Sequence, residues 1–176
     1  MNNINLSDNY SVMIEKPLSD FDRTTLRMLY LPILGGKVLN VYYNLYDSII
    51  SGEHESLVYN FERLIRILDT TEDELKKSLD KLEATGLIDT YYSEGLYVYY
   101  LKKVITPSEF FKDEVLFQTL ISYLTKEEAE RVALELLVRR IDISKFENIS
   151  KRFDEVYFIE EEINHLPVDN LVLETS

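Results

Sequence analysis

The sequence contains no cysteine, and it contains no hydrophobic run of the length that a membrane-spanning helix requires. Such a helix takes about 20 consecutive apolar residues, so any membrane association of this chain would be peripheral or would run through partners. Residues 1–10 are polar and lack the basic start and the apolar stretch of a secretory signal peptide. The absence of cysteine and of a signal peptide together predict a protein of the reducing cytoplasm.

Positive charge is also scarce. The 176 residues include 19 Lys or Arg against 32 Asp or Glu, for a net charge of −13, which repels phosphate at long range and disfavours non-specific nucleic-acid binding. The acidic excess is uneven, because no Lys or Arg follows Arg152. Seven acidic residues lie beyond that point: Asp154, Glu155, Glu160, Glu161, Glu162, Asp169 and Glu174. We therefore interpret residues 146–176 as an acidic tail that serves as a linker or as a docking segment.

Groups suited to catalysis or metal binding are few. The two histidines, His54 and His165, lie in polar segments, and Glu162 precedes His165 at the Glu-x-x-His spacing of di-iron sites. A di-iron site needs that motif twice together with further carboxylates, so a solvated histidine is the better interpretation. Residues 35–37, Gly-Gly-Lys, resemble part of a phosphate-binding loop, but the earlier glycine and the Ser or Thr after Lys37 are missing. We expect no enzyme activity, no metal and no cofactor.

Two helices are expected in the early part of the chain. One begins near Asp20, a residue suited to the N-cap, and runs until Pro32 halts it. A second, longer helix opens after Gly35 and Gly36. Its apolar residues cover nearly every face, which is typical of a helix enclosed on most sides: Val38, Leu39, Val41, Tyr42, Tyr43, Leu45, Tyr46, Ile49 and Ile50. This helix is expected either at the centre of the domain or in an interface.

A helix-turn-helix pattern follows. Apolar residues from Leu57 to Leu68 recur at the spacing of an amphipathic helix. After a short turn, Thr71 and Glu74 have the spacing of a capping box that starts the next helix. Gly86 is expected to end that helix, because glycine readily adopts the left-handed conformation of a C-terminal cap.

Two aromatic strands complete the pattern. Residues 87–92 and 96–101 are rich in aromatic and aliphatic side chains, and Ser93, Glu94 and Gly95 between them predict a three-residue hairpin loop. Helix, tight turn, helix and hairpin in this order are typical of a winged helix-turn-helix domain.

We therefore expect a mainly α fold with a small β-hairpin, in which a winged helix-turn-helix domain is followed by C-terminal helices. Capping boxes at Thr106 with Glu109 and at Thr125 with Glu128 start helices beyond the hairpin, and helical structure is expected to reach about Arg140. The expected segments are an N-terminal extension (1–19), the winged-helix domain (20–104), a helical extension (105–145) and the acidic tail (146–176).

The expected recognition helix lacks the charge that DNA binding requires. Its three lysines, Lys76, Lys77 and Lys81, are outnumbered by Glu72, Asp73, Glu74, Asp80 and Glu83, for a local net charge of −2. The acids gather at the amino end of the helix, where helix-turn-helix proteins usually meet base edges. A sequence-specific, DNA-binding transcriptional regulator with this fold stays open as an alternative, because arginines elsewhere could gather into a basic patch.

The hairpin is instead apolar or aromatic on both faces. One face can rest on the helices of its own domain, and the other would then be left as an exposed patch. Tyrosine suits protein interfaces because it combines a wide contact area with a polar tip. We expect self-association through the hairpin and the long helix, at Tyr91, Tyr92, Leu96, Tyr97, Val98, Tyr99, Tyr100, Tyr42, Tyr43 and Tyr46. A Tyr97→Glu, Tyr99→Glu variant is then expected to stay folded yet dissociate. Coverage of the hairpin by the C-terminal helices of the same chain stays open.

Four segments carry a family resemblance. They are Phe21–Arg23 leading to Leu29–Gly35, Leu82–Ile88 at the entry to the hairpin, Thr106–Asp113, and Phe153–Val156. Together they span about residues 20–156, and the Pro-Ser-Glu-Phe-Phe run after the hairpin is the most telling. On these motifs the chain resembles the amino-terminal domain of the Gram-positive replication-initiation and membrane-attachment protein DnaB, of the DnaB/DnaD primosomal family. That family is unrelated to the hexameric helicase of the same name.

The resemblance implies a factor of replication initiation and restart that helps load the replicative helicase. This domain would act as its oligomerisation and protein-docking module. It implies a homo-oligomer, a dimer or a tetramer, and contacts with a DnaD-like partner, the helicase and its loader ATPase. In the family, binding of single-stranded DNA is mainly assigned to a following helical domain that this chain does not include. Weak or no DNA binding by this chain alone is therefore expected.

Overall fold

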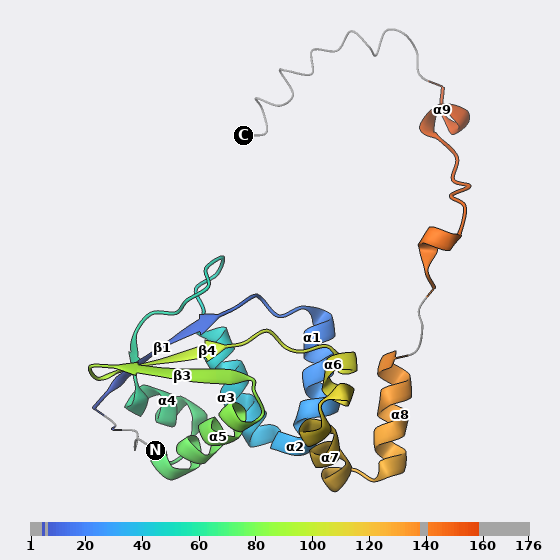
Figure 1. Cartoon of the computed structure of the whole chain (residues 1–176). Helices are drawn as coiled ribbons and strands as arrows, with labels where there is room; N and C mark the ends of the chain where they lie inside the picture. The colour runs from blue at the N-terminus through green and yellow to red at the C-terminus, as the bar shows by residue number, and fades with distance from the viewer. Residues whose placement is uncertain (1–4, 6, 138–140, 159–176) are drawn as a thin grey trace, which may run out of the picture. The chain divides into compact units, whose positions relative to one another are not determined.

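The computed structural model describes residues 5, 7–137 and 141–158. The chain divides into two compact units, Met1–Val138 and Arg139–Ser176. The second unit holds a short 3-10 turn, η2 (Ile143–Lys145), and a short helix, α9 (Phe153–Val156). The first unit contains, in chain order, β1 (Asn9–Ile14), α1 (Asp20–Thr25), the π-helical turn η1 (Leu26–Tyr30), α2 (Leu31–Leu34), α3 (Gly36–Asp47), β2 (Tyr59–Asn60), α4 (Phe61–Leu68), α5 (Glu72–Ala84), β3 (Ile88–Ser93), β4 (Leu96–Leu101), α6 (Pro107–Lys112), α7 (Glu114–Tyr123) and α8 (Lys126–Leu137) (Figure 1).

The helices α3, α4 and α5 followed by the β3–β4 hairpin form the predicted winged helix-turn-helix. The end of α5 follows the predicted chemistry: Gly86 has a φ of 78°, and the backbone N–H of Leu87 donates to the carbonyl of Leu82 at 3.1 Å. This bond and that from Gly86 N to the carbonyl of Glu83 complete a Schellman motif. The expected fold class, mainly α with a small hairpin and further helices after it, is confirmed.

The turn of the hairpin is shorter than predicted. Ser93 pairs with Leu96 in the antiparallel ladder, so the loop consists of Glu94 and Gly95 alone. Both have positive φ angles, 45° and 81°, as a type I′ turn requires. The prediction of a three-residue loop was wrong because a two-residue turn of this type already matches the right-handed twist of the strands.

The first helix also departs from the prediction. Its N-cap is Ser19 rather than Asp20: Ser19 and Asp22 exchange side-chain and backbone hydrogen bonds of 3.0 and 2.9 Å. The helix does not end at Pro32 but continues through α2 to Leu34. Just before Pro32 the backbone widens into a π turn, in which Leu31 N donates to the carbonyl of Leu26, five residues back. Such a turn accommodates the missing N–H and the bulky ring of a proline.

Strand β1 was not predicted from the sequence. The sheet order is β2-β1-β4-β3, and β1 runs parallel to β4 from the pair Asn9–Leu96 to the pair Ile14–Leu101. Residues 9–14, expected in an N-terminal extension, therefore form an inner strand of the sheet. The other proposed segment limits stay predictions.

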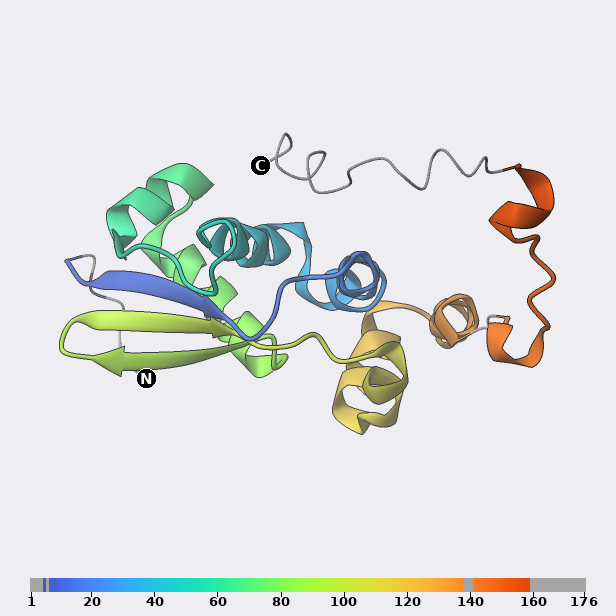
Figure 2. The ribbon, with the colours of Figure 1, turned by 90° about the horizontal axis from the view of Figure 1, so that it is seen from above.

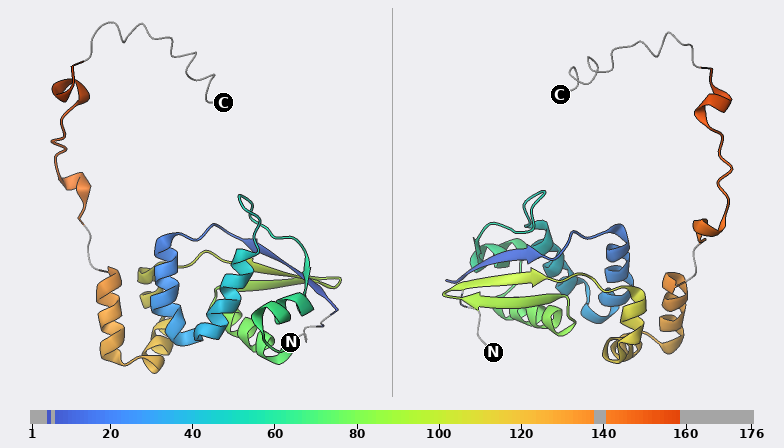
Figure 3. Two further views of the ribbon diagram at one scale, coloured as in Figure 1. Left: turned by 180° about the vertical axis from the view of Figure 1, so that it is seen from behind. Right: turned by 45° about the horizontal axis from the view of Figure 1, so that its top comes forward.

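Helices α3, α4 and α5 cover one face of this sheet (Figure 2). The C-terminal helices pack elsewhere: α6, α7 and α8 lie beside α1 and α2, past the end of the strands (Figures 1 and 3). Their anchor is Phe110, whose ring meets that of Tyr30 edge-on with centroids 5.3 Å apart. The predicted capping box of α8 is confirmed, since Thr125 N donates to Glu128 and Glu128 N donates to Thr125, each at 3.1 Å. No helix in the described ranges combines the length and apolarity needed to span a membrane.

Candidate protein-interaction site

The two faces of the sheet differ sharply in burial. On the inner face, toward the helices, Tyr97 and Tyr99 of β4 are only 6% and 1% exposed. The ring of Phe61 in α4 lies 5.5 Å from that of Tyr97 and 6.3 Å from that of Tyr99, nearly perpendicular to both. Strand β1 adds Tyr10 to the same cluster, 5.2 Å from Phe61. One face of the hairpin is thus buried in the core of its own domain.

Three of the predicted interface residues are corrected by this burial. Tyr97 and Tyr99 belong to the inner face, and Tyr42 of α3 is 1% exposed. Tyr42 is buried because α3 is the central helix of the domain, packed against α5 and β1. None of the three has side-chain area to offer to another molecule.

The outer face of the sheet is different, because no helix of the first unit lies over it (Figure 3, right). The ladder places Tyr91 of β3 opposite Val98, and Met13 of β1 opposite Tyr100. Tyr91 is 58% and Met13 39% exposed, while Leu96, Val98 and Tyr100 are half-buried by their neighbours in the sheet. We call the set Met13, Tyr91, Leu96, Val98 and Tyr100 the outer sheet face.

Charge is nearly absent from the outer sheet face. Asp89, opposite Tyr100, lies 3.8 Å from the ammonium of Lys102, which compensates its charge. The other side chains of the three paired strands on this side are the uncharged Asn9, Ser11 and Ser93. An isolated bridge between Met13 and Glu55 adds one exposed carboxylate at the β1 edge. Met13 and Ser11 were not predicted to lie on this face because β1 was not predicted as a strand. The alternation of polar and apolar residues from Asn9 to Val12 was the sequence signal that could have revealed this strand.

Tyr92 belongs to the inner side but lies at the exposed tip of the hairpin. Its ring is 4.7 Å from that of Tyr97, and its hydroxyl accepts a hydrogen bond of 3.2 Å from Gly95 N. With 51% of its surface exposed, Tyr92 supports the turn and remains accessible at the rim.

Tyr43 and Tyr46 lie on α3, on a different surface from the hairpin aromatics. The guanidinium carbon of Arg23 lies 5.7 Å from the ring centre of Tyr43 and 5.6 Å from that of Tyr46. The hydroxyl of Tyr46 accepts a hydrogen bond of 3.0 Å from Leu18 N. Burial raises the pKa of Tyr43, and the positive charge of Arg23 opposes that shift. These contacts hold α1 against α3, so the structure does not join the two tyrosines to the outer sheet face.

Helix α5 presents the charge pattern expected from the sequence. Glu72, Asp73 and Glu74 occupy its first turn, where they complement the helix dipole. Glu74 accepts a hydrogen bond of 2.9 Å from the Thr70 hydroxyl, and this bond, followed by the charge of Lys37, lowers its pKa. The negative charge of Glu74 at the amino end of a recognition helix repels phosphate. Of the arginines that could have formed a basic patch, Arg139 and Arg140 lie outside the described residues.

Comparison with known proteins adds three findings. The family model of the DnaB N-terminal winged helix domain matches residues 4–171. A curated relative, the replicative helicase loading/DNA remodeling protein DnaB of Staphylococcus aureus, is 23% identical over 154 residues, which are 85% of this chain and 33% of the relative. A crystal structure of primosome protein DnaB (residues 1–300) from Geobacillus stearothermophilus superposes with a TM-score of 0.69 at 26% identity, covering 86% of this chain and 59% of that one. The chain thus spans about a third of the curated relative's length.

Proposed function

The chain belongs to the family of DnaB N-terminal winged helix domains, and from that premise we propose that it takes part in the initiation of DNA replication, in the loading of the replicative helicase. The proposal is supported by the relatives named above, one a helicase-loading protein and the other a primosome protein. Because the chain spans only part of each, the contribution of this domain must be argued from its own surface.

Within that process, the domain acts as a module for self-association and protein docking. The observation that carries this proposal is the outer sheet face, which is apolar, partly exposed, and uncovered by any helix of the first unit. A contiguous apolar surface of this kind on a soluble domain marks an interaction site. Tyrosine and methionine are both enriched in protein interfaces.

The charges favour a second copy of the chain as the partner that binds to the outer sheet face. Two molecules of net charge −13 repel each other at long range. Within the hairpin the carboxylate of the outer sheet face, Asp89, is compensated by Lys102. The exposed Glu55, which is bridged to Met13, lies at the β1 edge of the face, so few like charges oppose each other when two hairpins meet. A two-fold axis through the sheet would place the same patch of both molecules in contact, as in most homodimers. A tetramer would need a further surface, and Tyr92 at the hairpin rim is accessible for one.

The remaining partners follow from the family. A DnaD-like protein, the helicase and its loader ATPase would dock on surfaces that the self-associated domain leaves free. Binding of DNA by this chain alone is weak or absent, because the acidic first turn of α5 occupies the position from which such helices approach a groove.

The experiment compares two double variants of equal charge. Met13→Glu with Tyr91→Glu places two carboxylates on the outer sheet face, and Val115→Glu with Tyr123→Glu places two at exposed positions of α7. The mass of the particle is measured by sedimentation and by light scattering, over a range of protein concentrations. We expect the first variant to dissociate to a monomer with its circular dichroism spectrum unchanged, and the second to keep the parental mass.

Two results would reject the proposal. The first is a parent chain that remains a strict monomer at the highest concentration. The second is an outer-face variant that dissociates no more readily than the α7 variant, since that would place the contact elsewhere.

A further inference from the structure

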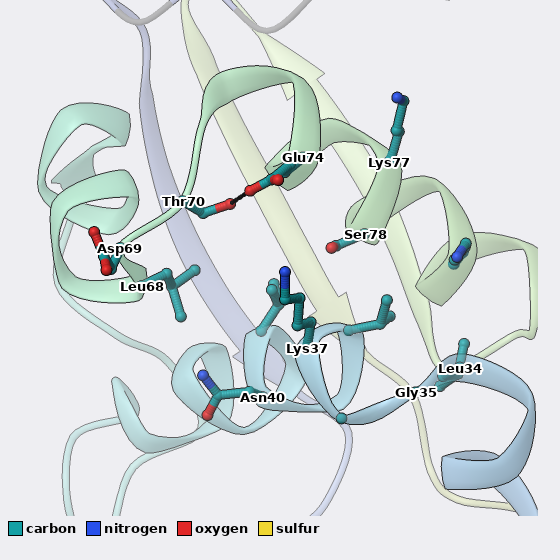
Figure 4. A pocket seen from close by; sticks show the side chains of 14 residues that line it. Leu34, Gly35, Lys37, Asn40, Leu68, Asp69, Thr70, Glu74, Lys77 and Ser78 are labelled. Carbon is teal, nitrogen blue, oxygen red and sulfur yellow. Dashed lines mark hydrogen bonds between the residues drawn. The ribbon is translucent and has the colours of Figure 1, made fainter.

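A pocket of about 430 Å³ lies between α3 and α5, away from the outer sheet face (Figure 4). Its floor is apolar, formed by Leu34, Val38, Val41 and Leu68. Its volume falls within the range of about 300–1,000 Å³ that is usual for ligand pockets. Leu34, Val38 and Val41 are the edge of the core at this hollow, and the proposed self-association does not use it.

The rim of the pocket is basic, in contrast with the chain as a whole. Three lysines line it, Lys37 from α3 and Lys77 and Lys81 from α5. In the described part of the chain none of the three ammonium groups lies within 4.0 Å of a carboxylate. Two carboxylates, Asp69 and Glu74, also line the pocket, which leaves a local excess of one positive charge.

Two polar side chains, Lys37 and Ser78, face the space between α3 and α5, while Lys77 extends from α5 away from that space (Figure 4). Glu74 accepts the hydroxyl hydrogen of Thr70 at 2.9 Å, and the charges of Lys37 and Lys77 help to lower its pKa, so an incoming anion competes with Glu74 for these lysines. Figure 4 shows Lys37 rising from α3 toward α5 and the hydroxyl of Ser78 directed from α5 toward the hollow. Ammonium and hydroxyl donors thus stand above an apolar floor, an arrangement that suits a ligand with an apolar group next to carboxylates.

We propose that this pocket binds an acidic segment of a partner protein, in which aspartate or glutamate residues flank a leucine or a similar apolar side chain. The apolar side chain enters the floor between α3 and α5, and the flanking carboxylates pair with Lys37, Lys77 and Lys81. A nucleic acid fits less well, since it has no leucine-like side chain for the apolar floor between α3 and α5. The site is independent of self-association, because it shares no residue with the outer sheet face.

The test uses the whole chain and a ten-residue peptide in which Asp and Glu flank two leucines. Binding is measured by calorimetry, and the position of binding by NMR shifts of backbone amides. A double variant of the pocket, Lys37→Glu with Lys77→Glu, is compared with a control double variant, Lys103→Glu with Lys112→Glu. The two control lysines are exposed and lie outside the pocket, and both double variants change the net charge equally. We expect the pocket pair to weaken peptide binding by about 10-fold or more and the control pair by about 2-fold or less.

A second variant tests the apolar floor without changing charge. Ser78→Trp fills the hollow from α5 and is expected to abolish binding, while thermal melting verifies that the domain is folded. A peptide in which both leucines are replaced by serine is expected to lose most of its affinity. Particle mass is expected to be unchanged in every pocket variant, which separates this site from the proposed function.

Four outcomes would overturn the inference. They are equal weakening by the two lysine pairs, undiminished binding of the serine peptide, no amide shifts at Lys37 or Ser78 at millimolar peptide, and equal affinity for a thymidine oligonucleotide or for inorganic phosphate. The last of these would assign the pocket to phosphate groups instead.

Discussion

The ring of Tyr10, on the strand that opens the domain, lies 5.2 Å from the ring of Phe61, the first residue of α4. Both side chains are fully buried. Phe61 in turn contacts Tyr97 and Tyr99, so Tyr10 joins the amino terminus to the centre of the hairpin. Strand β1 is therefore a structural part of the winged-helix core.

Loss of this contact is expected to be costly. Tyr10→Ala should lower the free energy of unfolding by about 3–5 kcal/mol, the usual effect of truncating a buried aromatic side chain. Urea unfolding followed by circular dichroism measures the change. Asn9→Ala, at the exposed neighbouring position, should stay within about 0.5 kcal/mol of the parent. A Tyr10→Ala variant as stable as Asn9→Ala would mean that β1 is dispensable.

The opposite faces of the hairpin should respond differently to the same substitution. Tyr99→Glu buries a carboxylate at a position that is 1% exposed, and the domain is expected to lose its cooperative melting transition. Tyr91→Glu, at 58% exposure, should melt within a few degrees of the parent. The double variant Tyr97→Glu, Tyr99→Glu, expected from the sequence to dissociate without unfolding, should therefore unfold. Two equal melting curves for Tyr99→Glu and Tyr91→Glu would contradict the assignment of the faces.

The hairpin turn offers a route to a more stable domain. Glu94 has a φ of 45°, a conformation that is unfavourable for most side chains but well tolerated by asparagine. Glu94→Asn should raise the free energy of unfolding by about 0.5–1 kcal/mol. Glu94→Val should lower it, since a β-branched residue is an outlier at positive φ. Thermal melting of the two variants should give shifts of opposite sign, and shifts of the same sign would argue against the type I′ turn.

Buried tyrosines predict a loss of stability at alkaline pH. Burial raises the pKa of the Tyr99 phenol well above its usual value of about 10, and the neighbouring Tyr97 acts in the same direction. The folded chain keeps a proton that the unfolded chain releases above about pH 10. The contribution of Tyr99 is therefore present below that pH, and the free energy of unfolding should fall above it, by up to about 1.4 kcal/mol per pH unit for this group.

Urea unfolding of the parent and of Tyr99→Phe, at pH 8 and at pH 11, measures this effect. The comparison at pH 8 gives the effect of the substitution on packing alone. Tyr99→Phe should then gain stability relative to the parent at pH 11. If the difference between the two proteins is the same at both pH values, Tyr99 is not protected from ionisation.

The ends of helices and strands could be predicted from the sequence wherever they depend on a few adjacent residues. The Thr125 and Glu128 capping box, the left-handed Gly86 and the order of helices and hairpin all follow from contacts within one turn of chain. Where two local signals competed, the prediction was wrong. Pro32 normally ends a helix, but a π turn carries the helix past it, and Ser19 displaced Asp20 as the N-cap.

The candidate site could be predicted only in part, for a related reason. The sequence showed that the hairpin is aromatic on both faces, and it could not show which face the helices would cover. The two faces carry side chains of the same apolar and aromatic kind: Tyr91 and Val98 on one, and Tyr97 and Tyr99 on the other. Met13 was missed altogether, because β1 is a strand only by virtue of pairing with β4, far along the chain.

The sequence by itself determined the winged-helix order, the acidic character of the chain and the aromatic content of the hairpin, because each depends on residue type and short-range spacing. Tertiary structure alone decided that β1 completes the sheet, that α3 to α5 bury the side carrying Tyr97 and Tyr99, and that α6 to α8 leave the other side open. Those choices depend on contacts between distant segments, where the free energy is set by which surfaces pack together rather than by what any one segment prefers.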